Sequence, residues 1–201
     1  MPGPATGSRV PRSGFPWGRW LLCGLWLCLS LQTGLTATAG LWQEEEQRLR
    51  VGLKIFPACL GAIDGLEARH SADGSLQVLV VYEGSADAAQ DVAFSLGGIG
   101  KIHGLPLRVK TVAAATLDGY SELPVAGIFV ASAGVGATRL KAWSERFQAL
   151  VFSPFAGEVE AGAVAGIAVA DQVLPFINPR QAQRAGVRFK PFFLKVARQY
   201  E

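Results

Sequence analysis

Two uninterrupted apolar runs constrain the fold of this chain more than any other feature. They are LQVLVVY over residues 76–82 and AGIFVA over residues 126–131. Runs without regular polar alternation are typical of strands that are buried on both faces, as in a parallel sheet. Parallel strands need crossover connections, which place helices on the faces of the sheet. The two runs therefore predict an α/β domain.

Helical and strand patterns alternate around these runs. Apolar residues at helical spacing predict helices over 87–96 and 138–147. Apolar and polar residues alternate over 105–112, which is typical of a half-buried or edge strand, and a short strand follows at 150–152. Because strands that alternate with helices pair in parallel, we expect a mostly parallel sheet flanked by helices.

An amphipathic helix precedes the first strand and begins near Trp42. Leu49, Leu53 and Phe56 form its apolar stripe. Pro57 has no amide hydrogen to donate, so we expect it to end or kink this helix.

The C-terminal third departs from the alternating order. Two β-like runs, 162–170 and 173–177, have the spacing of a hairpin. Asn178 is a typical N-cap for a short helix that ends near Gly186. Helical spacing over 189–200 predicts a last helix. The fold is therefore expected to finish with a β-hairpin and closing helices.

Residues 1–39 have the pattern of a secretory signal peptide. Three arginines lie within the first 19 residues, an uncharged apolar stretch spans 20–31, and Ala37 and Ala39 stand at the −3 and −1 positions. The pattern predicts cleavage before Gly40. An uncleaved membrane anchor stays open as the alternative, although a spanning helix needs about 20 mostly apolar residues.

Composition narrows the class of the remaining domain. The chain is 50% hydrophobic and 17% charged, which excludes a disordered protein. Three of the 19 Lys and Arg residues precede residue 40, which leaves 16 basic against 16 acidic residues. Such a balance gives no support to nucleic-acid binding. Cys59 is the one cysteine after residue 40, so we expect no intramolecular disulfide and a buried thiol.

The motif search finds no catalytic pattern. His70 and His103 have no metal-ligand spacing with other ligands, and Ser153 lies in FSPF rather than in a nucleophile elbow. No phosphate-binding P-loop occurs. We therefore expect neither an enzyme nor a cofactor.

The loop with Gly134 and Gly136 is the candidate ligand-binding loop. It joins a predicted strand to a predicted helix, and Arg139 stands in the first turn of that helix. Backbone amides at such a helix start can bind an anion. A tight strand-to-helix turn explains the same glycines without a ligand.

The segment around Phe155 is the candidate partner-binding surface. Phe155 follows Pro154 and can stand exposed in a loop, with Glu158 and Glu160 as a polar rim. The alternative is a loop phenylalanine that folds onto the sheet.

The C-terminal third also resembles the YfiR-like family of bacterial periplasmic proteins. The runs 76–84 and 126–134 look like the first and central strands of that family. The closest likeness is a glycine-rich hairpin followed by four short motifs: Phe176-Ile177-Asn178, 181–184, Ala185-Gly186-Val187 and Leu194-Lys195-Val196-Ala197.

This resemblance implies a regulatory function. The prototype of the family that the chain resembles is a periplasmic repressor that binds the periplasmic part of an inner-membrane diguanylate cyclase. This binding limits cyclic-di-GMP and biofilm formation. Other family members accompany sensor kinases. The resemblance implies that residues 40–201 form a periplasmic regulatory binding protein with an inner-membrane sensor as partner. A homodimer stays open.

A small-ligand binding module is the alternative function. Its pocket would lie at the carboxyl ends of the parallel strands, where ligands bind in open α/β sheets. The loops that contain Glu83, Ser132 and Ser153 would line it.

Overall fold

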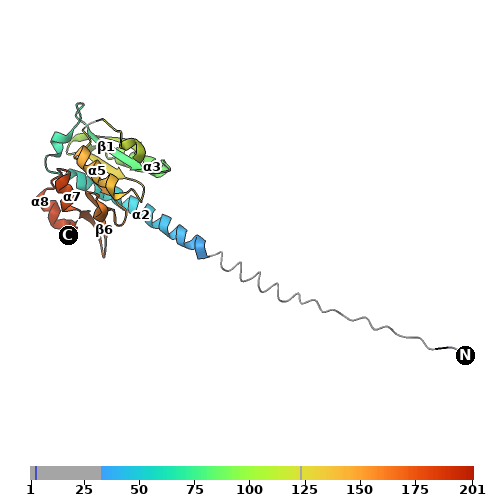
Figure 1. Cartoon of the computed structure of the whole chain (residues 1–201). Coiled ribbons are helices and arrows are strands. Elements are labelled where there is room, and N and C mark those ends of the chain that lie inside the picture. Colours follow the sequence, from blue (N-terminus) through green and yellow to red (C-terminus); the bar gives the residue numbers. More distant parts are fainter. Residues whose placement is uncertain (1–2, 4–32, 123) are drawn as a thin grey trace. The chain divides into compact units, whose positions relative to one another are not determined.

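The computed structural model describes residues 3, 33–122 and 124–201 (Figure 1). Most of the predicted signal segment, residues 1–39, lies outside the described residues, and Ala37, Ala39 and Gly40 fall within the first described helix, α2 (Thr33–Gly61). Cleavage therefore stays a prediction. Gln43–Glu201 form one compact unit. In the described part of the chain, no helix is long and apolar enough to span a membrane.

The domain is an α/β fold with a mostly parallel sheet flanked by helices. The described residues form eight strands in the order β2-β3-β1-β4-β5-β6-β7-β8. The pairs β2–β3 and β6–β7 are antiparallel, and the other neighbours are parallel. The strands are β1 (Leu76–Tyr82), β2 (Lys101–Ile102), β3 (Leu105–Ala113), β4 (Gly127–Val130), β5 (Leu150–Ser153), β6 (Ala165–Val169), β7 (Val173–Ile177) and β8 (Arg198–Gln199).

The central strands are apolar because both of their faces are covered. Every residue of β4 and β5 is buried. Phe56 of α2 packs its ring edge-on against Phe129 and Phe152, with ring centroids 5.5 Å apart in each pair. The other helices are η1 (Leu66–Arg69, a 3-10 helix), α3 (Asp87–Gly97), α4 (Ala114–Leu117), α5 (Ala137–Phe147), α6 (Glu158–Ala161), α7 (Pro179–Arg184) and α8 (Pro191–Val196).

The predicted start and end signals of the short helix in the C-terminal third are confirmed. The Asn178 side chain accepts a hydrogen bond from the amide of Gln181 at 3.0 Å and so caps α7. Gly186 has a φ of +62°, which favours glycine. α7 lies beside α5 (Figure 1), where Gln181 donates to the hydroxyl of Ser144 at 2.8 Å. Cys59 is fully buried, as expected, and burial raises the pKa of its thiol.

Two helix ends differ from those expected, although a kink at Pro57, the other expected effect of this residue, stays a prediction. α2 continues through Pro57 to Gly61, because the buried Cys59 and Leu60 keep its last turn packed on the core. The predicted last helix ends at Val196, and the chain then adds β8 to the edge of the sheet beside β7. Backbone pairing at that edge replaces the helical hydrogen bonds that the apolar spacing indicates.

Candidate functional site

The carboxyl edge of the sheet contains the loops that the sequence predicts to bind a ligand. The strand order reverses between β1 and β4, since β3 lies on one side of β1 and β4 on the other. The loops after these two strands bind each other: the amide of Glu83 donates to the Ser132 hydroxyl at 3.0 Å. The Ser132 hydroxyl contacts the carbonyl of Glu83 at 3.3 Å. The crevice is thus bridged by the chain's own groups.

Glu158 fills the predicted anion-binding turn. One oxygen of its carboxylate accepts from the amide of Gly134 at 2.8 Å, and the other accepts from the Ser153 hydroxyl at 2.6 Å. Glu158 is only 7% exposed. Desolvation raises the pKa of its carboxyl group, although these hydrogen bonds oppose the rise.

The side chain of Arg139 also has charged partners within the chain. Its Nη1 lies 3.1 Å from a carboxylate oxygen of Glu83, and its Nε lies 3.5 Å from Asp118. Gly134 has a φ of +82°, whereas Gly136 has an ordinary negative φ before α5. The structure therefore brings the predicted loop together, but with a carboxylate of its own in place of an external anion.

The predicted partner-binding segment is mostly buried. Phe155 is 5% exposed and belongs to the core, so the expectation of an exposed anchor is wrong. Glu158 points inward, as described above, and only Glu160 is exposed. The physical reason is α6, which the sequence does not predict: its turn folds Val159 and Phe155 onto the sheet.

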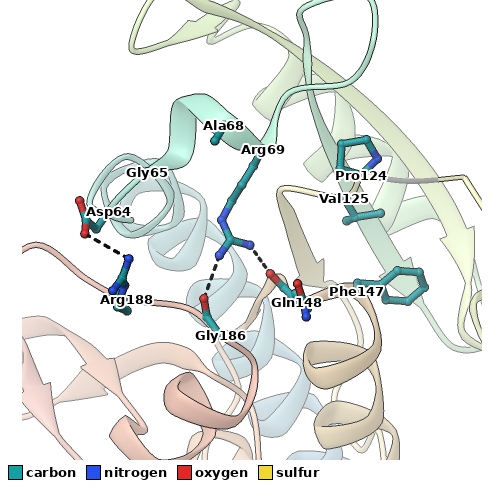
Figure 2. A pocket seen from close by; sticks show the side chains of 10 residues that line it. All are labelled: Asp64, Gly65, Ala68, Arg69, Pro124, Val125, Phe147, Gln148, Gly186 and Arg188. Carbon is teal, nitrogen blue, oxygen red and sulfur yellow. Dashed lines mark hydrogen bonds and ion pairs between the residues drawn. The ribbon is translucent and has the colours of Figure 1, made fainter.

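A pocket lies at the opposite, amino edge of the sheet (Figure 2). Its volume is about 450 Å³, within the range of small-molecule sites. Its lining comes from the segments that precede β1, β4 and β5 and from the turn after α7: Asp64, Gly65, Ala68, Arg69, Pro124, Val125, Phe147, Gln148, Gly186 and Arg188.

Arg69 extends across the middle of this pocket. Its guanidinium donates to the backbone carbonyl of Gln148 and, at 2.9 Å, to that of Gly186. Among the described residues it forms no ion pair with a carboxylate. Partial burial lowers the pKa of Arg69, but an arginine side chain still stays charged. A partly desolvated cation without an acidic partner is a candidate binding group for an anion.

The two sides of the pocket differ in polarity. Figure 2 shows Pro124, Val125 and Phe147 on one side of Arg69, and Asp64 with Arg188 on the other. Val125 is 1% exposed and Phe147 is 6% exposed, so the half-buried Pro124 presents most of the apolar surface on this side. Asp64 and Arg188 are exposed and form a loose ion pair at 4.0 Å. The pocket therefore offers an apolar wall, a central cation and a polar rim.

The backbone of Gln148, which lines the pocket, has a strained conformation. Its φ is +48°, in the left-handed region that side chains other than glycine rarely adopt. It ends α5 there and directs its carbonyl to Arg69. Backbone strain of this kind clusters at functional sites.

Sequence reasoning misses this pocket. Arg69 is 79 residues from Gln148 and 117 residues from Gly186 along the chain, so no local motif connects the three. The left-handed Gln148 carries no sequence signal either, because glycine is the usual residue at such a helix end. Only the helix terminator Gly186 is predicted.

Comparisons with known proteins do not place the chain in a family. No family model matches the sequence, and no characterised protein matches it. Among solved structures, the chain is similar to the ABC domain in complex with L-Trp from Streptococcus pneumonia, with a TM-score of 0.48 and 15% identity. The alignment covers 64% of this chain and 57% of that one, so it spans less than two thirds of the other protein.

Proposed function

We propose that residues 43–201 are a small-ligand binding module whose site is the pocket at the amino edge of the sheet. The observation that carries this proposal is Arg69: a charged, partly desolvated side chain in a pocket of about 450 Å³, bonded only to backbone carbonyls among the described residues. A preformed concave site with one central charged group is the usual design of a small-molecule site.

The location differs from the one that the sequence predicts for this alternative function. The carboxyl-edge loops are bonded to each other and to Glu158, so the amides of Glu83 and Gly134 and the hydroxyl of Ser153 have partners. At the amino-edge pocket, three N–H groups of Arg69 have no partner among residues 33–122 and 124–201, and there is room for a ligand. Open volume and unused hydrogen-bond donors thus both favour the amino edge.

A thermal-shift screen of the full chain against small metabolites tests the proposal. A ligand at about 100 times its Kd stabilises the folded state by about 2.7 kcal/mol, which is a rise in Tm of about 5 °C or more for a domain of this size. We expect hits that disappear in Arg69→Ala and persist in Arg180→Ala. Arg180 is an exposed arginine of α7 that does not line the pocket. Hits that persist in Arg69→Ala would place the site elsewhere.

A regulatory role through a protein partner is the second candidate function. It is supported by Phe192 and Val196, which are 64% and 58% exposed and stand four residues apart on α8. We propose that this apolar pair contacts the inner-membrane sensor that the YfiR-like resemblance implies. In a deletion strain, wild-type protein should restore the normal level of cyclic-di-GMP. A Phe192→Ser, Val196→Ser variant that restores it equally well would contradict this role.

A further inference from the structure

We infer that the pocket ligand is a small organic acid with an apolar body, whose carboxylate binds Arg69 and whose body lies against Pro124, Val125 and Phe147. This inference rests on the proposed function and names the chemistry of its ligand. Three observations carry it: the unused donors of Arg69, the charge of the lining and the polarity of the two walls.

The donors of Arg69 suit a carboxylate. A guanidinium has five N–H groups, and the two carbonyl contacts use two of them. Three are therefore left without a partner among the described residues. Their planar arrangement matches the two oxygens of a carboxylate, which an arginine binds through paired hydrogen bonds. The carbonyls of Gln148 and Gly186 meanwhile hold the guanidinium in place before the ligand arrives.

The charge of the lining favours a single negative charge. Arg69 and Arg188 are its cations and Asp64 is its acid. Arg188 is 84% exposed and faces Asp64, so it adds little to the field at Arg69. The carbonyl oxygens of Gln148 and Gly186 lie against the same guanidinium and would repel a doubly charged anion. One guanidinium therefore matches a monocarboxylate better than a phosphate.

The apolar wall determines the rest of the ligand. Val125 and Phe147 belong to the hydrophobic core, and Pro124 has a rigid ring, so this wall is preformed. An aromatic or branched aliphatic group placed here would be removed from water against the ring of Pro124. A ligand that carries only a charge would leave this side of the pocket unused.

Asp64 distinguishes two classes of ligand with a carboxylate and an apolar body, namely α-amino acids and simple carboxylic acids. Its carboxylate is 59% exposed, and its ion pair with Arg188 is loose at 4.0 Å. It lies on the opposite side of Arg69 from the apolar wall (Figure 2). An α-amino acid would place its ammonium group near Asp64, whereas a simple carboxylic acid would not use this residue. The shared chemistry is the amphipathic carboxylate, and Asp64 distinguishes the two.

Isothermal titration of the full chain with four probes tests the inference. The probes are 3-phenylpropanoate, L-phenylalanine, phenylethylamine and inorganic phosphate. We expect binding of at least one of the two carboxylates, and binding at least tenfold weaker for the amine and for phosphate. A pocket that takes the amine as tightly as the carboxylates, or that takes phosphate in their place, would overturn the inference.

Variants assign the binding to the pocket. Arg69→Lys keeps the charge but loses the planar fork, so we expect at least tenfold weaker binding, and Arg69→Ala should abolish it. Ala68→Trp leaves Arg69 in place and fills the pocket, so it should also abolish binding even where Arg69→Ala fails to fold. Asp64→Asn should weaken only L-phenylalanine. Unchanged affinity in both Arg69→Ala and Ala68→Trp would overturn the inference.

The failure of this inference and that of the proposed function have different signatures. If the screen finds ligands that need Arg69 but are not carboxylates, the binding module stands and the assigned chemistry is wrong. If no ligand of any class depends on Arg69, the binding module itself fails. Arg180→Ala is the matched control in both experiments and should bind as the wild type does.

Discussion

The charged side chains at the two edges of the sheet differ in the partners that they have. At the carboxyl edge, Glu158 and Arg139 have charged or polar partners within the chain. At the amino edge, the partners of Arg69 among the described residues are backbone carbonyls, and Arg69 lines a pocket. The carboxyl edge is the usual ligand site of open α/β sheets. In this domain its groups bond to one another instead, and we propose that the opposite edge binds the ligand.

The close approach of β5 and β6 at the carboxyl edge gives the largest expected effect. A Cβ at Gly166 would lie 2.1 Å from the carbonyl oxygen of Ser153 and 2.6 Å from Val159. Gly166→Ala should therefore lower the free energy of unfolding by about 3 kcal/mol or more, as measured by urea denaturation. Gly97→Ala is the control, since no atom lies within 4 Å of its added Cβ. A stable Gly166→Ala variant would show that this edge is not tightly closed.

Removal of the Glu158 carboxylate tests the closed edge by its hydrogen bonds. Glu158→Ala leaves the Gly134 amide and the Ser153 hydroxyl without their partner. We expect a loss of about 2–3 kcal/mol in the free energy of unfolding. Glu160→Ala, in the same short helix but exposed, should change it by less than about 0.5 kcal/mol. Equal effects of the two substitutions would remove the distinction between a structural and a surface carboxylate.

The same carboxylate predicts how stability depends on pH. Because the pKa of Glu158 is raised in the folded state, the folded protein holds this proton more tightly than the unfolded chain does. Its contribution to stability should therefore fall as the pH rises from about 4.5 through the folded pKa. Nearby Glu45 adds to the rise.

Glu158→Gln isolates this contribution. The exposed Glu67, Asp73 and Glu122 have lowered pKa values and act in the opposite sense, below about pH 4.5, in both proteins. We expect the free energy of unfolding of the wild type, relative to Glu158→Gln, to decrease between pH 4 and pH 7. A difference that is constant or increases over this range would contradict a desolvated Glu158.

The sequence predicts the central strands and the ends of α7 better than it predicts the contacts at either edge of the sheet. The strands β1 and β4 can be predicted without tertiary information, because consecutive apolar residues indicate burial on both faces of the sheet. The N-cap Asn178 and the terminator Gly186 are equally local. The edges differ because their partners are distant: Glu158 binds an amide 24 residues away, and Arg69 a carbonyl 117 residues away.

Short elements escape prediction for a related reason. α6 has four residues, Glu158–Ala161, which is too short to show a periodic pattern. The sequence therefore leaves Phe155 and Glu158 in an exposed loop, whereas this single turn buries both. The predicted exposure of Phe155 and Glu158 is therefore wrong, whereas partner binding stays a prediction.

The strain at Gln148 gives the smallest expected effect and sharpens the comparison at the amino edge. Gln148→Gly should relieve the positive φ and raise the free energy of unfolding by about 0.5–1 kcal/mol, measured by thermal denaturation. Gln183→Gly, an exposed position within α7, should instead lower it by a similar amount. If Gln148→Gly is as destabilising as the control, Gln148 carries no strain and this sign of a functional site is lost.

Two-dimensional ¹H–¹⁵N NMR of the full chain, titrated with 3-phenylpropanoate and L-phenylalanine, reports on both edges of the sheet at once and shows which edge binds the ligand. We expect chemical-shift changes for the Nε–H of Arg69 and for the amides of Gln148 and Gly186, with the amides of Gly134 and Val135 unmoved. Shifts at Gly134 and Val135, with Gln148 and Gly186 unmoved, would contradict binding at the amino edge.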